Sequence, residues 1–173
     1  MSSNRVAIIG INVLSSSIAL GLQEHKEPVE IIGYDADQAK ADLANVRGVV
    51  DEVRRKPGPA CEGASLVIVA EPLANIEKTF AALSPSLEEG AVVTDTARLK
   101  APVLRWAEDY LPEHASFVGG HLIPNPAVIG MQSLEGIGDA SSDLLREALY
   151  CFTPSPATPS TAIDFCTWLA YAL

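Results

Sequence analysis

The 173-residue sequence predicts an α/β protein of the Rossmann type, with a doubly wound, mostly parallel sheet and helices on both faces. Short apolar runs alternate along the chain with segments of helical periodicity. Residues 65–70 (Ser-Leu-Val-Ile-Val-Ala) form a continuous apolar run, as expected for a strand covered on both faces. The first apolar run, at 5–9, ends in a glycine, and small residues lead from it into a helical segment.

The expected elements follow from these patterns in chain order. The predicted strands are 5–9, 29–35, 65–70, 90–95, 116–121 and 149–153. The predicted helices are 16–23, 36–46, 73–83, 97–110 and 158–173, with Gly48 as the C-cap of the second. Residues 56–59 (Lys-Pro-Gly-Pro) are expected to form a loop, and residues 122–140 show little periodicity. Strands joined by helices pair in parallel, so ligands are expected at the carboxyl ends of the strands.

Composition and charge restrict the classes of function. Hydrophobic residues make up 48% and charged residues 20% of the chain, which is typical of a soluble globular protein. The formal net charge of −10 argues against nucleic acid or an anionic membrane as a partner, and no apolar stretch approaches the length of a membrane helix. Three cysteines without metal-like spacing indicate reduced thiols, so we expect a cytoplasmic protein without a metal site.

The turn after the first strand is the candidate phosphate site, because a helix that starts at such a turn presents free N–H groups to a pyrophosphate. The dinucleotide fingerprint requires Gly-x-Gly-x-x-Gly, whereas this chain has Gly10, Asn12 and Ser15. Asn12 tolerates left-handed backbone angles and can donate a hydrogen bond, but its side chain occupies space that the phosphates need. The turn is therefore either a working cofactor site or the remains of one.

Asp35 ends the second predicted strand, 20 residues (35 − 15) beyond Ser15. A carboxylate at this position can accept hydrogen bonds from both ribose hydroxyls of an adenosine, and it would repel a 2′-phosphate. Because no arginine follows at Ala36 or Asp37, we expect NAD in preference to NADP, or no cofactor if the turn is not competent. The alternative for Asp35 is an acidic N-cap of the following helix.

Two side chains at the same sheet edge are candidate catalytic residues. His121 follows Gly119 and Gly120 at a strand end, where an imidazole can accept a proton from a substrate hydroxyl as hydride leaves the neighbouring carbon. Arg98 lies near the start of a helix and can bind a carboxylate or a phosphate. The alternatives are a structural histidine and a solvated surface arginine.

Together these segments resemble the nucleotide-binding domain of prephenate and arogenate dehydrogenases, the tyrosine-biosynthesis family. The resemblance rests on the order of five motifs: Ile-Gly-Tyr-Asp at 32–35, Val-Ile-Val-Ala-Glu-Pro at 67–72, Val-Thr-Asp-x-x-x-x-Lys at 93–100, Phe-Val-Gly-Gly-His at 117–121 and Phe-Thr-Pro at 152–154. It implies NAD(P)-dependent oxidation of a ring hydroxyl with loss of carbon dioxide, with His121 as the partner of that hydroxyl. The candidate cofactor-binding residues are Gly10, Ile11, Asn12, Val13, Leu14, Asp35, Ala70, Glu71, Pro72 and Asp95.

The sequence departs from the family pattern beyond the turn. Arg98 stands where the family has a serine that helps to hold substrate and nicotinamide, and Leu-Ile-Pro-Asn at 122–125 replaces a Pro-Met-Ala-Gly-like segment. The resemblance also implies a C-terminal helical domain that dimerises and completes the substrate site, and we expect residues 1–173 not to include it. We therefore expect residues 1–173 to be a dinucleotide-binding domain whose last helix leads to that domain, and the homodimer to form through parts not present here.

Three hypotheses about function remain open. The first is a prephenate-dehydrogenase-like oxidoreductase domain, whose small-molecule substrate resembles prephenate or arogenate. The second is a degenerate, non-catalytic Rossmann domain that binds another nucleotide or a protein partner, and the two replaced turn glycines favour it. The third is a β-hydroxyacid or imine reductase relative with an altered substrate.

Overall fold

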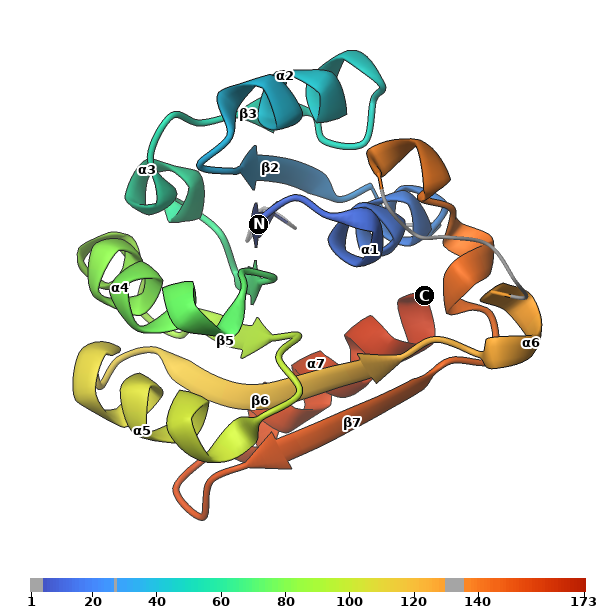
Figure 1. The fold of residues 1–173 in the computed structure, drawn as a ribbon. Helices are drawn as coiled ribbons and strands as arrows, with labels where there is room; N and C mark the ends of the chain where they lie inside the picture. Colours follow the sequence, from blue (N-terminus) through green and yellow to red (C-terminus); the bar gives the residue numbers. More distant parts are fainter. Residues whose placement is uncertain (1–4, 27, 130–135) are drawn as a thin grey trace.

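The computed structural model describes residues 5–26, 28–129 and 136–173 and contains a seven-stranded sheet (Figure 1). Its strands are β1 (Arg5–Ile9), β2 (Glu30–Tyr34), β3 (Glu52–Val53), β4 (Leu66–Val69), β5 (Val92–Asp95), β6 (Ser116–Ile123) and β7 (Leu149–Pro154). The spatial order is β3-β2-β1-β4-β5-β6-β7; β1 to β6 pair in parallel, and β7 runs antiparallel to β6. The predicted Rossmann-type fold is confirmed.

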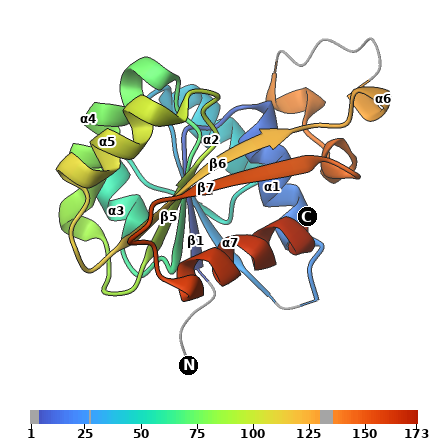
Figure 2. The same ribbon diagram turned by 90° about the horizontal axis from the view of Figure 1, so that it is seen from below.

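Helices cover both faces of this sheet (Figures 1 and 2). One face carries α1 (Val13–Gln23), α2 (Gln38–Val46) and α7 (Ser160–Ala172), and the other carries α3 (Pro57–Cys61), α4 (Leu73–Leu83) and α5 (Lys100–Tyr110). Every residue of β4 is buried, because apolar side chains point alternately into the two layers. Between β6 and β7 lie α6 (Pro126–Ile129) and two 3₁₀ turns, Ile137–Asp139 and Ser142–Leu145.

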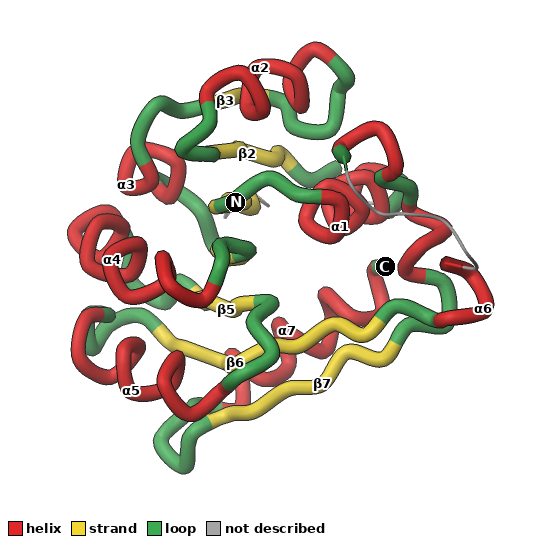
Figure 3. The backbone as a smooth tube through the Cα atoms, in the orientation of Figure 1, coloured by secondary structure: helices red, strands yellow, loops and turns green. Residues whose placement is uncertain are grey.

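Figure 3 marks the helices, strands and loops along the chain, and several of their boundaries differ from those predicted. Helix α1 begins at Val13 instead of residue 16, because Asn12 caps it. Helix α2 begins at Gln38, because Asp37 and not Asp35 is its N-cap. The predicted loop at 56–59 instead enters α3, which starts on Pro57, a residue well suited to the first helical turn.

Tertiary pairing explains the remaining differences. Strand β3 has only two residues, too few for a recognisable pattern, and is held by β2. Strand β6 continues to Ile123 because β7 pairs with its whole second half. Helix α5 starts at Lys100, three residues later than predicted. Of the predicted irregular stretch 122–140, residues 130–135 lie outside the described part of the chain.

The strand order reverses between β1 and β4, which are neighbours in the sheet although not in the chain. Gly10, the residue after β1, has φ +91°, and a Cβ there would lie 2.9 Å from the carbonyl carbon and oxygen of Ala70, the residue after β4. Only glycine allows the two loops to approach this closely with that backbone angle. The close approach fixes the floor of the site described next.

Candidate functional site

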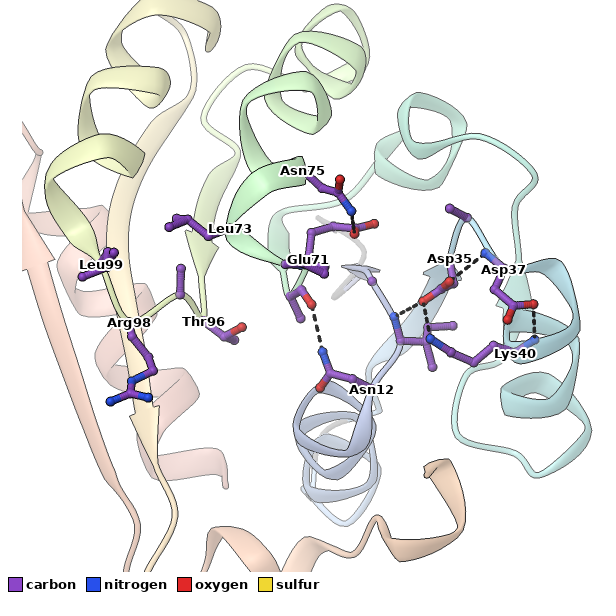
Figure 4. A pocket seen from close by; sticks show the side chains of 16 residues that line it. Asn12, Asp35, Asp37, Lys40, Glu71, Leu73, Asn75, Thr96, Arg98 and Leu99 are labelled. Atoms are coloured by element: carbon purple, nitrogen blue, oxygen red, sulfur yellow. Dashed lines mark hydrogen bonds and ion pairs between the residues drawn. The ribbon is translucent and has the colours of Figure 1, made fainter. Parts of the chain in front are cut away.

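A cavity of about 890 Å³ lies at the carboxyl edge of the sheet, above the point where the strand order reverses (Figure 4). Its walls come from the segments that follow β1, β2, β4 and β5, within residues 10–12, 35–40, 70–75 and 96–99. In doubly wound sheets this crevice is where ligands bind. The cavity brings together eight of the sequence-predicted site residues: Gly10, Ile11, Asn12, Asp35, Ala70, Glu71, Pro72 and Arg98.

Asp35 sits at the tip of β2 with only 8% of its surface exposed. Its Oδ2 accepts a hydrogen bond of 2.8 Å from the amide of Ile11, and its Oδ1 accepts one of 2.8 Å from the amide of Asp37. The ammonium group of Lys40 lies 3.8 Å from Oδ2. A carboxylate oxygen can accept two hydrogen bonds, so Asp35 links the first turn to the cavity wall and keeps acceptor capacity for a ligand.

The cap of α2 is Asp37, whose carboxylate accepts from the amides of Ala39 at 3.0 Å and Lys40 at 3.3 Å. This assignment removes the structural alternative considered for Asp35, which has no role as the helix cap. Lys40 was not expected at the site from the sequence. The helix cap could have indicated this position: once Asp37 is known to cap α2, Lys40 falls in the first helical turn, where side chains point back toward the end of β2.

The turn after β1 satisfies most of its own hydrogen-bonding groups. Asn12 caps α1 in a reciprocal capping box with Ser15: the Ser15 amide donates to Asn12 Oδ1 at 3.1 Å, and the Asn12 amide donates to Ser15 Oγ at 2.9 Å. The backbone of Asn12 is extended (φ −140°, ψ −179°), so the tolerance of asparagine for left-handed angles is not needed at this position. The left-handed residue of the turn is Gly10, where φ is +91°.

The first turn of α1 still offers two donors. Within the described residues, no hydrogen bond engages the amides of Val13 and Leu14, which are the first two helical positions. Val13 and Leu14 line a second cavity of about 660 Å³, which shares Ile11 and Asn12 with the first. These amides and the helix dipole are the part of the site suited to an anion.

The far wall of the first cavity carries Glu71 and Asn75, whose side chains are joined by a hydrogen bond of 3.3 Å (Figure 4). The pKa of the neighbouring Tyr34 is raised, first by burial and then by the negative charges of Glu71 and Asp35. The rim is therefore electronegative at the end of β2. Arg98 lies on the opposite rim, is exposed, and has no ion pair or hydrogen bond within the described residues.

Asp95 does not line either cavity. It is completely buried at the end of β5, and Lys100 Nζ lies 2.6 and 2.5 Å from its two carboxylate oxygens. The amides of Gly120 and Ala97 also donate to it, at 3.0 Å each. Burial is the largest influence on both partners: it raises the pKa of Asp95 and lowers that of Lys100, while their pairing opposes both shifts. Asp95 therefore contacts the cavity wall through Ala97 without lining the cavity itself.

His121 lies in β6, directly across from Cys151 of β7, and lines neither cavity. Its Nδ1 is buried and has no hydrogen-bond partner among the described residues. The preceding residue, Gly120, is held through its carbonyl by Lys100 and through its amide by Asp95. The structure thus brings His121 to the same sheet edge as the cavity but not into its wall.

Comparison with known proteins adds a family to this geometry. Residues 18–169 match the family model described as prephenate dehydrogenase, nucleotide-binding domain. The chain belongs to this family. The matched region begins after the turn at 10–15, so the match does not bear on the replaced glycines.

Two curated relatives agree with this assignment. Prephenate dehydrogenase of Bacillus subtilis (strain 168) is 28% identical over 163 residues, covering 92% of this chain and 42% of the relative. Cyclohexadienyl dehydrogenase of Zymomonas mobilis is 26% identical over 160 residues, covering 92% of this chain and 52% of the relative. The chain thus spans about half the length of these two relatives.

Solved structures of the family share the fold. Prephenate dehydrogenase from A. aeolicus, in complex with hydroxyphenyl propionate and NAD+, has a TM-score of 0.83 at 22% identity, covering 99% of this chain and 58% of that one. Synechocystis arogenate dehydrogenase has a TM-score of 0.81 at 24% identity, covering 95% and 55%. In the described part of the chain, no helix is long and apolar enough to cross a membrane.

Proposed function

We propose that this chain is the NAD-binding domain of a prephenate-dehydrogenase-like oxidoreductase. The observation that carries the proposal is the Asp35 carboxylate, held at the cavity wall by the amides of Ile11 and Asp37 with acceptor capacity left for ribose hydroxyls. The amides of Val13 and Leu14, which make no hydrogen bond within the described part of the chain, add donors for phosphate oxygens. These residues fit an adenine dinucleotide laid across the strand ends.

The preference for NAD over NADP follows from the charges around Asp35. A 2′-phosphate would lie beside the carboxylates of Asp35 and Asp37, while the cation in reach, Lys40, already lies 3.8 Å from Asp35. An additional dianion there meets net repulsion. The proposed order of affinity is therefore NAD above NADP.

The substrate side of the proposed site is the end formed by β5 and β6. When bound, NAD would supply a hydride acceptor. His121 would accept the hydroxyl proton of the substrate, and Arg98 would bind a substrate carboxylate of a prephenate- or arogenate-like molecule. Arg98 is exposed on the cavity rim and unpaired within the described residues, which suits this role. The proposal extends to a cytoplasmic enzyme of tyrosine biosynthesis that acts as a homodimer.

Calorimetric titration with NAD and NADP tests the cofactor assignment on this chain. We expect NAD to bind and NADP to bind at least about ten-fold more weakly. Asp35→Asn should weaken NAD binding by about ten-fold or more, because hydrogen bonds from ribose hydroxyls to a charged acceptor are lost. Asp42→Asn is the matched control, since Asp42 is an exposed carboxylate of α2 that lines neither cavity. Absence of heat and of thermal stabilisation at millimolar NAD would contradict the proposal.

A degenerate, non-catalytic domain is the second candidate, and the self-capped turn at Asn12 and Ser15 favours it. The two candidates differ in what His121 does. In a full-length protein with dehydrogenase activity, His121→Ala should lower the rate by about 10²-fold or more if the imidazole takes the proton. An unchanged rate would reject that role for His121, and a full-length protein that binds NAD without turnover would favour the second candidate.

A further inference from the structure

One side chain joins the loops that follow β1 and β4, across the point where the strand order reverses. The Nδ2 group of Asn12 donates a 2.8 Å hydrogen bond to the carbonyl of Ala70, and its Oδ1 accepts from the amide of Ser15. Figure 4 shows this side chain reaching from the start of α1 to the opposite loop. Both ends of the carboxamide are therefore used within the chain.

These bonds also remove donors that a phosphate would use. The Asn12 amide donates to Ser15 Oγ, and the Ser15 amide donates to Asn12 Oδ1. The Ile11 amide donates to Asp35, and the Gly10 amide donates to the carbonyl of Tyr34. With glycine at positions 12 and 15, neither side-chain acceptor would exist, and two further amides would face the crevice. Of the four backbone amides at positions 12–15, those of Asn12 and Ser15 are thus used within the turn, and those of Val13 and Leu14 remain for an anion.

We propose that Asn12 is a latch, defined as its side chain with the bonds to Ala70 and Ser15, that separates nucleoside binding from pyrophosphate binding. With the latch closed, the chain binds the adenosine part of a ligand at Asp35. A pyrophosphate is admitted only when the carboxamide leaves Ala70 and Ser15. This inference rests on the proposed function, because it assumes that the ligand is an adenine dinucleotide.

The latch is built to open at a small cost. Asn12 is an exposed residue, and its bonds to Ala70 and Ser15 are only partly buried, so water can replace them. Among the described residues, the hydrogen bonds of the carboxamide go only to the carbonyl of Ala70 and the amide of Ser15. Opening of the latch therefore leaves the fold intact. It changes only the contribution of the phosphates to the affinity for the ligand.

Paired titrations of adenosine and ADP-ribose separate the two halves of the ligand. For the wild type, ADP-ribose should bind within a few-fold of adenosine, because its phosphates must displace the latch. In Asn12→Gly/Ser15→Gly, ADP-ribose should bind about ten-fold more tightly than to the wild type, while adenosine affinity stays the same. Asn12→Ser retains an oxygen that can cap the Ser15 amide but is too short to reach Ala70, so it should give a smaller gain for ADP-ribose alone.

Asn45→Ser is the matched control, since Asn45 Nδ2 also donates to backbone carbonyls, those of Val50 and Asp51, but lies outside both cavities. It should change neither affinity. The side-chain amide signals of Asn12, assigned in ¹H–¹⁵N spectra by their loss in Asn12→Ser, should shift on addition of ADP-ribose and not of adenosine.

The possible results distinguish the latch from the proposed function. If adenosine binds and the double glycine variant leaves ADP-ribose affinity unchanged, the latch is wrong and the adenosine site stands. If ADP-ribose already binds the wild type far more tightly than adenosine, the latch is likewise wrong. If neither compound binds to the wild type or to the variants, the proposed function fails, and the inference fails with it.

Discussion

Replacing Lys100 by Met should destabilise the fold by about 3 kcal/mol at neutral pH, because it leaves the carboxylate of Asp95 buried without its cation. Asp95 has no exposed surface, and the side chain of Lys100 is only 15% exposed. Removing one partner of a buried pair typically costs about 3–5 kcal/mol. The lower end applies here, because the amides of Gly120 and Ala97 continue to donate to the carboxylate.

The destabilisation should depend on pH, with a sign set by the pKa of Asp95. Burial raises this pKa, and Lys100 opposes the rise, so the pKa of Asp95 climbs further in Lys100→Met. A carboxyl group with a raised pKa in the folded state contributes stability that is complete below its unfolded value, 3.8, and is lost as the pH rises through the folded value. The variant should therefore approach the wild type near about pH 4 and fall behind it toward neutrality.

Urea unfolding followed by tryptophan fluorescence at acidic and neutral pH measures this difference. Trp106 and Trp168 pack in the two opposite helical layers, so the signal reports on both faces of the sheet. A loss of about 3 kcal/mol corresponds to a Tm lower by about 6–12 °C for a chain of this size. Asp95→Asn/Lys100→Met, which removes both charges, should recover much of the loss. The reasoning is refuted if Lys100→Met stays within about 1 kcal/mol of the wild type at both pH values, as a surface pair would.

Two further predictions concern the backbone of the turn and the cysteines. Gly10→Ala should destabilise the protein by more than about 2 kcal/mol, because φ is +91° and a Cβ would lie 2.9 Å from backbone atoms of the neighbouring loop. Gly48→Ala, with φ +69° and nothing within 4 Å, should cost only about 1 kcal/mol, and equal losses in denaturant unfolding would contradict the importance of close approach. At about pH 8, a thiol-specific reagent should label the exposed Cys151 in the native protein, whereas burial raises the pKa of Cys61 and Cys166 to about 12 and protects both. Rapid labelling of a second native thiol, seen by mass spectrometry, would show that this protection is absent.

The fold was predictable because its signals are local. The continuous apolar run in β4, the glycine directly after β1 and the aspartate directly after β2 can each be interpreted from a few neighbouring residues. The rule that ligands bind at strand ends then places the site without any long-range information. Eight of the twelve candidate site residues indeed line one cavity.

Side-chain direction was not predictable in the same way. The strand-end rule brings Asp95 and His121 to the correct edge, but it does not say whether their side chains reach the cavity, and neither residue lines it. Asp95 turns into the protein because Lys100, five residues later in the first turn of α5, supplies a cation there. The Asp-x-x-x-x-Lys spacing at a strand-to-helix junction contains this information, but only once the start of the helix is known.

The glycine fingerprint alone does not indicate the role of Asn12. An Asn-x-x-Ser sequence before an apolar helix also matches the N-cap pattern, in which side chains satisfy the first amides of the helix. The structure adopts this second pattern, with Asn12 extended and Ser15 within the first turn of α1. A sequence that meets two local rules needs the packed structure to decide between them.

The three glycine positions of the turn carry different physical demands, which explains why two of them could change. Position 10 requires left-handed backbone angles and space against the loop after β4, so it remains glycine. Positions 12 and 15 hold an extended and a helical residue, and neither conformation requires glycine. In a glycine-rich turn the free amides at the helix start await an anion, whereas Asn12 and Ser15 satisfy theirs within the chain. The replacements therefore leave the fold unchanged and alter only the chemistry that the turn offers to a ligand.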